Sequence, residues 1–444
     1  MDVNNITPRE IILGILLEIT ENGAYSHLAI RSALDKYQYL GKQDRSFITR
    51  ICEGTLERMI TIDYIIGQFS TVKVSKMKPV LRGILRFSVY ELKYMDSIPP
   101  SATCNEAVKL AQKKGFRSLK GFVNAVLRNI ARNLDALSFP DPHSSPLDSL
   151  SITYSMPLWI LELWKGSYSL LQIEEFLKAF LSPSPTTIRI NPLKTSKEDL
   201  ISELKADGIK VSDETGIPNA LFISNYDYLG KIPAFQSGKF YVQDLSSMQV
   251  SLWAAPKKGD YVIDVCAAPG GKSIHMAELM EGSGIVEARD ISPYKVSFIK
   301  ENIERCQLPN IRPMVADARI LEQEKIRQAD IVIADLPCSG LGALGKRSDM
   351  KYKLTPQMCQ DLVLLQREIL HTVQQYVKPG GVLMYSTCTI NPAENEENVS
   401  WFLESHPHFT LERQQQILPE EKLNDGFFLA KLLCQATGKN MPNR

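Results

Sequence analysis

The second half of the chain alternates strand-like and helix-like segments, and this alternation restricts the fold more than any other feature. From about residue 260, the apolar stretches YVIDVCAA, GIVEARD, IVIADLP and VLMYSTC are separated by segments with helical periodicity. Parallel strands joined by helices form a doubly wound α/β sheet, which binds ligands beyond the carboxyl ends of its strands. We therefore predict a Rossmann-like domain over residues 249–444.

The first part of the chain is expected to contain only helices. Thr7-Pro8-Arg9-Glu10 is a capping box with proline at the first helical position, and Thr103-Cys104-Asn105-Glu106 is predicted to be another. This pattern indicates a compact all-α bundle over residues 1–135. Residues 136–151 contain three prolines and five serines, which is typical of a linker. A small α/β subdomain is predicted over residues 152–248.

The net charge of +1 conceals an asymmetry along the chain. Residues 1–135 contain 20 Lys and Arg against 13 Asp and Glu, a balance of +7, whereas the rest contains 31 against 37, a balance of −6. A basic front half suggests a polyanionic partner, although chance variation of the surface gives the same numbers. Lys109, Lys113, Arg117 and Lys120 lie either on one helix face or around a corner near Gly115. Such a group either contacts phosphates or is simply solvated.

The chain has eight scattered cysteines and no CxxC pair, which favours reduced thiols in a cytoplasmic protein over disulfides or a metal site. Its start, MDVNNITPRE, lacks the basic region of a signal peptide, and no apolar stretch approaches the roughly 18 residues of a membrane span. We expect no membrane contact. Nothing in the sequence indicates more than a monomer.

The turn after the first strand of the α/β domain is rich in small residues and predicts a nucleoside site. A Walker A motif fails because Cys266 stands where glycine is required, and the GxGxxG pattern of dinucleotide sites is also absent. Such a turn suits a nucleoside ligand without a pyrophosphate. Asp290 and Asp317 end the next two strands, where carboxylates are expected to bind the ribose and the adenine side. The predicted turn residues are Cys266, Ala267, Ala268, Pro269, Gly270, Gly271 and Lys272.

Two further cysteines follow the next two strands and should face the same crevice. Cys338 comes after Asp335, and Cys388 ends the strand VLMYSTC. Methylation of cytosine at C5 requires a thiolate that adds to C6, a second group that assists release, and an acid near N3, for which Asp335 is placed. Either cysteine fits either role on spacing alone. Candidate positive neighbours that would favour the thiolate are Lys272, Lys346 and Arg347.

The motifs DVCAAPGGKS, DLPCSGLG and YSTCTINPAENEENV resemble those of RNA 5-methylcytosine methyltransferases of the Sun/NSUN superfamily. Gln243-Asp244-Leu245-Ser246-Ser247 and the closing DGFFLAKL resemble further parts of the family pattern. This resemblance implies that Cys388 is the nucleophile and that Cys338 assists product release. It also implies that S-adenosylmethionine is held by residues 266–272 with Asp290, Asp317 and Asp335.

Residues 1–135, including GFVNAVLRNI, resemble a NusB-type domain, and this fusion is characteristic of the ribosomal RNA small subunit methyltransferase B family. The resemblance implies methylation of 16S rRNA at cytosine 967. Residues 343–349 depart from the family pattern at Gly345 and Ser348, which leaves the role of this loop open. Two alternatives remain: a tRNA cytosine-C5 methyltransferase, and a non-catalytic RNA-binding factor for assembly or antitermination.

Overall fold

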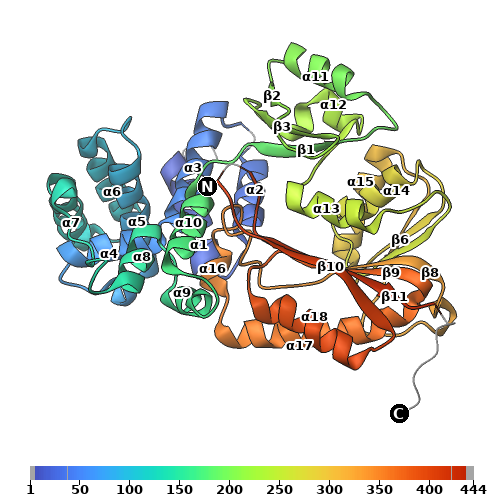
Figure 1. The fold of residues 1–444 in the computed structure, drawn as a ribbon. Helices are drawn as coiled ribbons and strands as arrows, with labels where there is room; N and C mark the ends of the chain where they lie inside the picture. The colour runs from blue at the N-terminus through green and yellow to red at the C-terminus, as the bar shows by residue number, and fades with distance from the viewer. Residues whose placement is uncertain (1–5, 38, 422, 437–444) are drawn as a thin grey trace. The chain divides into compact units, whose positions relative to one another are not determined.

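The computed structural model describes residues 6–37, 39–421 and 423–436, and the chain folds into two units (Figure 1). The first unit comprises Met1–Leu181 together with Leu344–Lys353. The second comprises Ser182–Ala343 and Leu354–Arg444. A short segment from the second half of the chain is therefore part of the first unit. Among the described residues, no helix is long and apolar enough to cross a membrane.

The first unit is all-helical, as predicted for the front of the chain. Thr7 caps the first helix with both hydrogen bonds of the predicted capping box, and Ile12, Ile48, Ile62 and Leu85 are fully buried in a shared core. The helices are α1 (Pro8–Thr20), α2 (Ser26–Lys36), α3 (Lys42–Glu57), α4 (Met59–Phe69), α5 (Pro79–Tyr94), α6 (Pro100–Lys113), α7 (Lys120–Arg132), α8 (Pro146–Tyr154), α9 (Leu158–Lys165), α10 (Leu170–Leu181) and α16 (Met350–Lys353).

The second predicted capping box is wrong. Thr103 lies inside α6, which begins three residues earlier at Pro100, so its hydroxyl does not cap the helix. Instead, the Thr103 hydroxyl donates a hydrogen bond of 2.9 Å to the buried carboxylate of Glu91 on α5. Proline at the first helical position supplied the start of this helix. The S/T-x-x-E pattern alone therefore does not identify a helix start when its threonine has a buried partner.

The structure also differs from the prediction between residues 136 and 181. Helix α8 begins at Pro146, inside the predicted linker, and α9 and α10 belong to the helical unit rather than to an α/β subdomain. Trp164 packs these two helices against each other. Its ring packs against Phe176 and Phe180, with centroids 6.3 and 6.1 Å away. This aromatic cluster joins α9 to α10.

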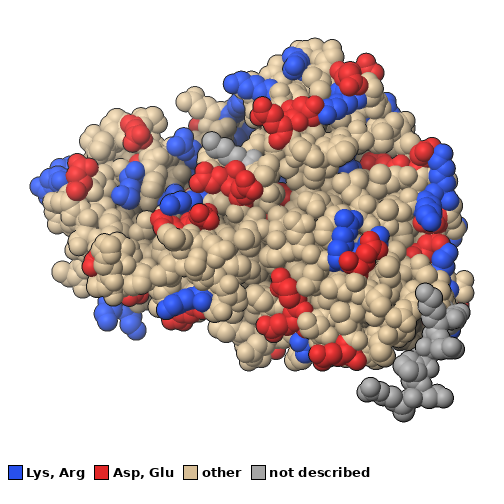
Figure 2. Space-filling view, viewed as in Figure 1, with Lys and Arg blue, Asp and Glu red and all other residues tan. Residues whose placement is uncertain are grey.

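The four basic residues of the predicted cluster lie around a corner rather than on one face. Helix α6 ends at Lys113, Gly115 has a left-handed φ of 90°, and Lys120 begins α7. Lys113 and Lys114 both approach the Glu10 carboxylate, at 2.7 and 3.5 Å. On the face that Figure 2 shows, basic and acidic side chains lie next to one another. The positive charge at this corner is therefore partly compensated by Glu10.

The second unit begins with a four-stranded antiparallel sheet in the order β2-β3-β1-β4. Its apolar core includes Ile188, Leu200 and Leu221. Gly208 has a left-handed φ of 77° directly after α11, as expected where a helix closes. The elements are β1 (Thr186–Ile190), α11 (Lys197–Ala206), β2 (Lys210–Ser212), β3 (Ala220–Ser224), α12 (Pro233–Gln236), β4 (Phe240–Val242) and α13 (Leu245–Ala254).

A seven-stranded sheet in the order β10-β11-β9-β8-β5-β6-β7 follows and confirms the doubly wound α/β prediction. The five strands from β5 to β9 are parallel, while β10 and β11 pair antiparallel at one edge. The strands are β5 (Tyr261–Asp264), β6 (Ile285–Asp290), β7 (Ile311–Val315), β8 (Ala329–Asp335), β9 (Val377–Thr387), β10 (Phe409–Ile417) and β11 (Phe427–Cys434). The helices are α14 (Gly271–Leu279), α15 (Pro293–Cys306), α17 (Pro356–Val373) and α18 (Glu396–Ser405).

Helices cover both faces of this sheet because successive strand residues point to opposite sides. Val262 shares a core with Ile274 of α14 and Val296 of α15. Its neighbour Ile263 shares a different core with Leu370 of α17 and Phe402 of α18. Both faces of the central strands are thus buried, which explains their nearly continuous apolar sequences.

The segment Leu344–Lys353 is held in the helical unit by polar contacts, and α16 appears in orange among the blue and green helices in Figure 1. Asp349 is buried and accepts hydrogen bonds from the backbone and hydroxyl of Ser26, at 3.0 and 2.8 Å, and from Lys353 at 2.9 Å. The buried Lys351 donates to the carbonyl of Glu57 at 2.8 Å. These contacts give the divergent loop a structural anchor.

We predict that Asp349→Asn destabilises the protein in a pH-dependent way. Burial raises the pKa of Asp349, but the hydrogen bonds of Lys353 and Ser26 outweigh it, so the pKa is lowered. A lowered folded-state pKa gives stability that is present above the unfolded pKa and lost as the pH falls. Urea unfolding should show a cost of about 1–3 kcal/mol at pH 7 that shrinks below about pH 4.

The exposed Asp96 provides the control, because Asp96→Asn should leave the unfolding free energy nearly unchanged. A cost for Asp349→Asn that is the same at every pH would contradict an ionic anchor.

Candidate active site

The two predicted cysteines lie together at the carboxyl ends of neighbouring strands. Strands β8 and β9 pair in parallel with Asp335 opposite Ser386, so the loops that follow them emerge side by side. The sulfur atoms of Cys338 and Cys388 are 3.3 Å apart. The backbone N–H of Cys388 donates to the Cys338 sulfur, also at 3.3 Å. All eight cysteines lie within the described residues, and none forms a disulfide.

The environment of the Cys338 sulfur disfavours its ionisation. The neighbouring Cys388, burial and the negative charge of Glu394 all raise the pKa of Cys338 well above its ordinary value. Cys338 is therefore a protonated thiol at neutral pH, and a protonated thiol can donate a hydrogen bond to an adjacent sulfur.

Asp335 joins the cysteine loops to the start of α14. Its carboxylate accepts hydrogen bonds from Lys272 at 2.6 Å and from the Ser386 hydroxyl at 2.7 Å. Of the three predicted positive neighbours of the thiols, Lys272 is thus tied to the acid at the end of β8. Lys346 and Arg347 instead lie in the segment Leu344–Lys353, which belongs to the helical unit.

The predicted nucleoside turn, residues 266–272, connects β5 to α14. Gly270 has a φ of 107° and precedes the first residue of the helix, so a side chain at this position would strain the backbone. The backbone N–H of Ala267 donates to the carbonyl of Arg289 at 2.7 Å, which fixes the turn beside β6. The helix N-terminus and the small side chains leave polar backbone groups at the edge of the sheet.

Acidic side chains surround this turn, and one of them was not predicted. Asp264 ends β5, and one of its carboxylate oxygens accepts a hydrogen bond of 2.6 Å from Ser273. Burial raises the pKa of Asp264 to about 7. Its other oxygen is buried without a hydrogen-bond partner among the described residues. Such an acceptor at a small-residue turn fits a ligand that brings a donor or a positive charge.

The two other predicted acids differ from one another. Asp290 is buried at the end of β6 and accepts a hydrogen bond from the backbone of Ser292 at 3.1 Å. Asp317 follows β7 and is paired with Arg319, at 2.7 Å. Hydrogen bonds from Arg319 lower the pKa of Asp317. Asp290 is therefore the better placed of the two to contact a ligand at the turn, since Asp317 already has a charged partner.

A buried ion pair that sequence reasoning missed connects the small sheet to the nucleoside turn. Arg189 of β1 donates to Glu278 of α14 at 2.9 Å, and both side chains are only 2% exposed. The same guanidinium donates to the carbonyl of Gly271 at 3.2 Å and to the side chain of Gln243. Gln243 belongs to the QDLSS motif, whose Asp244 caps α13. The motif therefore braces the first turn of α14.

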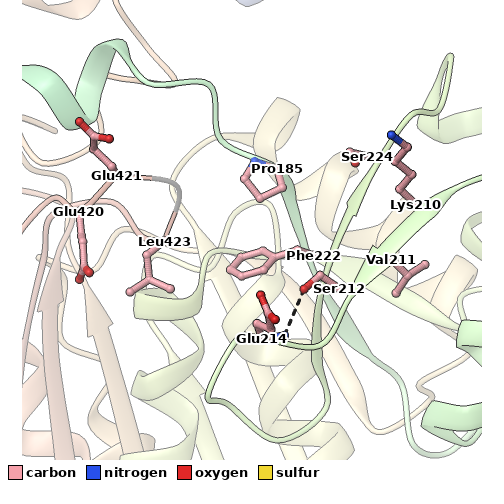
Figure 3. Close-up of a pocket in the computed structure, with 10 residues that line it drawn as sticks. All are labelled: Pro185, Lys210, Val211, Ser212, Glu214, Phe222, Ser224, Glu420, Glu421 and Leu423. Carbon is pink, nitrogen blue, oxygen red and sulfur yellow. Dashed lines mark hydrogen bonds between the residues drawn. The ribbon is translucent and has the colours of Figure 1, made fainter.

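A cavity of about 460 Å³ lies elsewhere in the second unit (Figure 3). It is bordered by β2, β3 and by Glu420, Glu421 and Leu423, and Ser212 accepts a hydrogen bond from the backbone of Glu214 at its rim. The ten residues that line it include none of the predicted catalytic or cofactor residues. The cysteines and the nucleoside turn are therefore separate from this cavity.

Comparison with known proteins finds a matching family model for three segments of the chain. Residues 251–433 match the model of the 16S rRNA methyltransferase RsmB/F family, residues 6–132 match the NusB family, and residues 156–226 match the RsmF/B-like ferredoxin-like domain. The probable ribosomal RNA small subunit methyltransferase B of Bacillus subtilis is 35% identical, over 96% of this chain and 98% of that protein. The chain belongs to this family.

Further relatives extend the comparison. Ribosomal RNA small subunit methyltransferase B of Proteus mirabilis is 29% identical over 95% of this chain and 97% of its own length. The crystal structure of PH0851 has a TM-score of 0.81 at 30% identity and covers 96% of this chain and 99% of its own. NSun6 from Pyrococcus horikoshii, crystallised with SFG, has a TM-score of 0.56 at 26% identity and covers 62% of this chain and 97% of its own.

Membership of the family confirms the predicted resemblance and the NusB-like and Rossmann-like parts of the fold. It also confirms S-adenosylmethionine as the cofactor. The turn at residues 266–272 fits that group, because Asp264 offers a buried acceptor oxygen without a partner among the described residues. Asp290 stands at the end of β6, one strand away. When bound, the cofactor supplies an electrophilic methyl group on a cationic sulfur.

We predict that breaking the buried ion pair from one side costs more than removing it completely. Arg189→Met leaves the Glu278 carboxylate buried without its charge partner and should cost about 3–5 kcal/mol. Burial raises the pKa of Glu278 even though Arg189 opposes this, so the carboxylate carries a desolvation penalty. The double variant Arg189→Met/Glu278→Met removes that penalty and should recover part of the loss. Urea unfolding of the three proteins measures this, and equal losses in both variants would contradict it.

Proposed function

We propose that this protein transfers a methyl group from S-adenosylmethionine to C5 of a cytosine in 16S ribosomal RNA. The observation that carries the proposal is the pair of sulfurs, 3.3 Å apart, at adjacent strand ends. Asp335 at the end of β8 is bonded to Lys272 of the cofactor turn, which connects the cysteine loops to the cofactor site. A protein that only bound RNA would need neither thiol, and neither would an enzyme that methylated a ring nitrogen.

The two cysteines divide the chemistry between them. The Cys388 thiolate forms a bond to C6 of the ring, and C5 gains enough electron density to take the methyl group as its bond to the sulfonium breaks. The proton on C5 then passes to solvent, the ring double bond forms again, and Cys388 leaves as a thiolate. Cys338, held as a neutral thiol, donates a hydrogen bond to the departing sulfur. Cys388 is the nucleophile and Cys338 assists release.

Asp335 stabilises the ring while Cys388 is attached. In its protonated form Asp335 donates a hydrogen bond to N3 and so neutralises the negative charge that develops on the ring. Lys272, whose Nζ is 2.6 Å from the Asp335 carboxyl group, supplies positive charge at the same edge. Ser386 holds the other oxygen of Asp335. The acid is thus oriented by one residue of the cofactor turn and one residue of β9. Residues 266–272 with Asp290 and Asp317 bind the cofactor.

The 16S rRNA is proposed as substrate because the named relatives are small subunit rRNA methyltransferases and match nearly the whole chain. Cytosine 967 is the position that the family resemblance implies. The target base must leave its stack to reach the cysteine pair, which is easiest in a loop. The NusB-like bundle carries a balance of +7 and contributes contacts to phosphates. We propose a cytoplasmic monomer.

Substituting the cysteines separates their roles. Cys388→Ala should abolish methyl transfer by at least about 1,000-fold, while the binding of S-adenosylmethionine measured by calorimetry stays near the wild-type level. Cys338→Ala should accumulate a covalent protein–RNA adduct, because the Cys388 sulfur leaves slowly. Denaturing gel electrophoresis with labelled RNA detects the adduct. An adduct that persists in the double variant Cys338→Ala/Cys388→Ala, or methylation that survives in Cys388→Ala, would overturn the assignment.

The substrate is tested by methyl transfer from labelled S-adenosylmethionine to unmodified 16S rRNA and to bulk tRNA, with Cys388→Ala in parallel. Label on 16S rRNA that disappears in the variant supports the proposal, and sequencing of the product locates the cytosine. Label on tRNA alone would retain the chemistry and replace the substrate. Cofactor binding without transfer to either RNA would favour a non-catalytic RNA-binding factor.

A further inference from the structure

Glu394 is a fully buried carboxylate beside the cysteine pair, and neither the sequence motifs nor the chemistry above assigns it a role. It lies in the 3-10 turn Pro392–Glu394, between β9 and α18. Its oxygens accept four hydrogen bonds: from the backbone of Ser339 at 2.8 Å, the Ser339 hydroxyl at 2.5 Å, Gln366 at 3.0 Å and Asn391 at 3.0 Å. All four donors are neutral.

These donors come from the segments that carry the two cysteines. Ser339 directly follows Cys338, and Asn391 lies three residues after Cys388. The Ser339 hydroxyl is also 2.8 Å from the Thr389 hydroxyl, which directly follows Cys388. Each cysteine loop is therefore bonded to the other through residues adjacent to the cysteine, and Glu394 is the shared acceptor.

Helix α17 completes the arrangement from the opposite side. Gln366 is fully buried and donates both to Glu394 and to the carbonyl of Pro337, at 2.9 Å. Pro337 directly precedes Cys338, so this loop is held on both sides of its cysteine by groups that meet at Glu394. The hydroxyl of Tyr385 donates to the backbone carbonyl of Glu394.

A buried carboxylate with only neutral partners is expensive, because its desolvation is only partly offset by hydrogen bonds. A neutral acceptor would hold the loops together at a smaller desolvation free energy, if the role of this residue were only structural. The negative charge has a chemical consequence at Cys338, however. Among the described titratable groups, Cys388, Glu394 and Tyr385 interact with the Cys338 thiol, and the charge of Glu394 disfavours its loss of a proton.

We propose that Glu394 is a positioning residue that clamps the Cys338 loop onto the Cys388 loop, with its carboxylate bonded to the residue next to Cys338. The release role of Cys338 rests on the function proposed above, whereas the clamp and the state of the thiol do not depend on it. Glu394 touches neither the base nor the cofactor in this role. It acts through Ser339 on the sulfur next to it.

Glu394→Gln tests the clamp, with Glu397→Gln as the matched control. Glutamine keeps the size of the side chain but turns an NH₂ group towards donors, so at least one of the four bonds is lost. Glu397 is an exposed carboxylate three residues along the chain. Single-turnover methylation of 16S rRNA should show that Glu394→Gln forms the covalent adduct and releases it roughly 100-fold more slowly, the scale of a small misplacement of a catalytic group. Glu397→Gln should match the wild type.

A second readout reports on the charge and requires no RNA. In a Cys388→Ala background, the alkylation of Cys338 by iodoacetamide is followed against pH by peptide mass spectrometry. Glu394→Gln should move the midpoint of the Cys338 profile to lower pH, because removal of the negative charge makes the thiolate easier to form. Glu397→Gln should leave the midpoint unchanged. Exposure of the loop would also move the midpoint to lower pH, because burial is a further cause of the raised pKa of Cys338. The variant Ser339→Ala, which keeps the charge, distinguishes the two effects.

Ser339→Ala separates the hydrogen bonds from the charge. It removes the hydroxyl bond but keeps the carboxylate, so release should slow while the alkylation midpoint stays. The double variant Ser339→Ala/Glu394→Gln should be no slower than Glu394→Gln, because both act through one contact. Additive losses, or an alkylation midpoint that Glu394→Gln does not move, would overturn the proposal. An absence of adduct in every protein, including Cys338→Ala, would contradict the proposed function and leave the alkylation result to decide on the clamp.

Discussion

The parallel pairing of β8 with β9 is the constraint on which the rest of the site depends. The register that sets Asp335 opposite Ser386 brings the ends of the two strands together, and the cysteine loops begin there. A slip of one residue would turn every side chain of a strand to the other face and separate the sulfurs. The two apolar cores on either side of the sheet prevent this slip, because consecutive residues such as Ile331 and Val332 belong to different cores.

Those parts of the fold in which apolar residues recur with a regular local spacing could be predicted from the sequence. The central strands are apolar throughout and were predictable, whereas β10, with the sequence FTLERQQQI, is mostly exposed and was not. Helix α2 carries only a weak apolar pattern, because Ile30 is its one residue that is buried. The cysteine pair could be inferred because strand ends converge in a doubly wound sheet. Spacing alone could not assign the roles of the two cysteines, which came only from the family resemblance.

The buried polar side chains are the part that sequence reasoning could not supply. Arg189 meets Glu278, 89 positions away, and Glu394 meets Ser339, 55 positions away. Neither pairing follows a local periodicity, since each depends on how elements that are distant in the sequence approach in space. The only available signal was the motif around them: Glu394 lies within NPAENEENV and Gln243 begins QDLSS. A polar residue inside a motif that no chemical step uses is a candidate for a brace.

Glycine explains how the loops around Cys388 pack so closely. The backbone N–H of Gly342 donates to the carbonyl of Cys388 at 3.0 Å, and Gly426 donates to the carbonyl of Gly342 at 2.8 Å. A side chain at Gly342 would collide with the backbone of Gly426. The loop that starts at Cys338 is thus bonded by Ser339 to Glu394 and by Gly342 to Cys388 itself. Two residues later, at Leu344, the chain joins the helical unit, where Asp349 anchors it. The segment 343–349 therefore begins next to the Gly342 contact with Cys388 and ends at the Asp349 anchor.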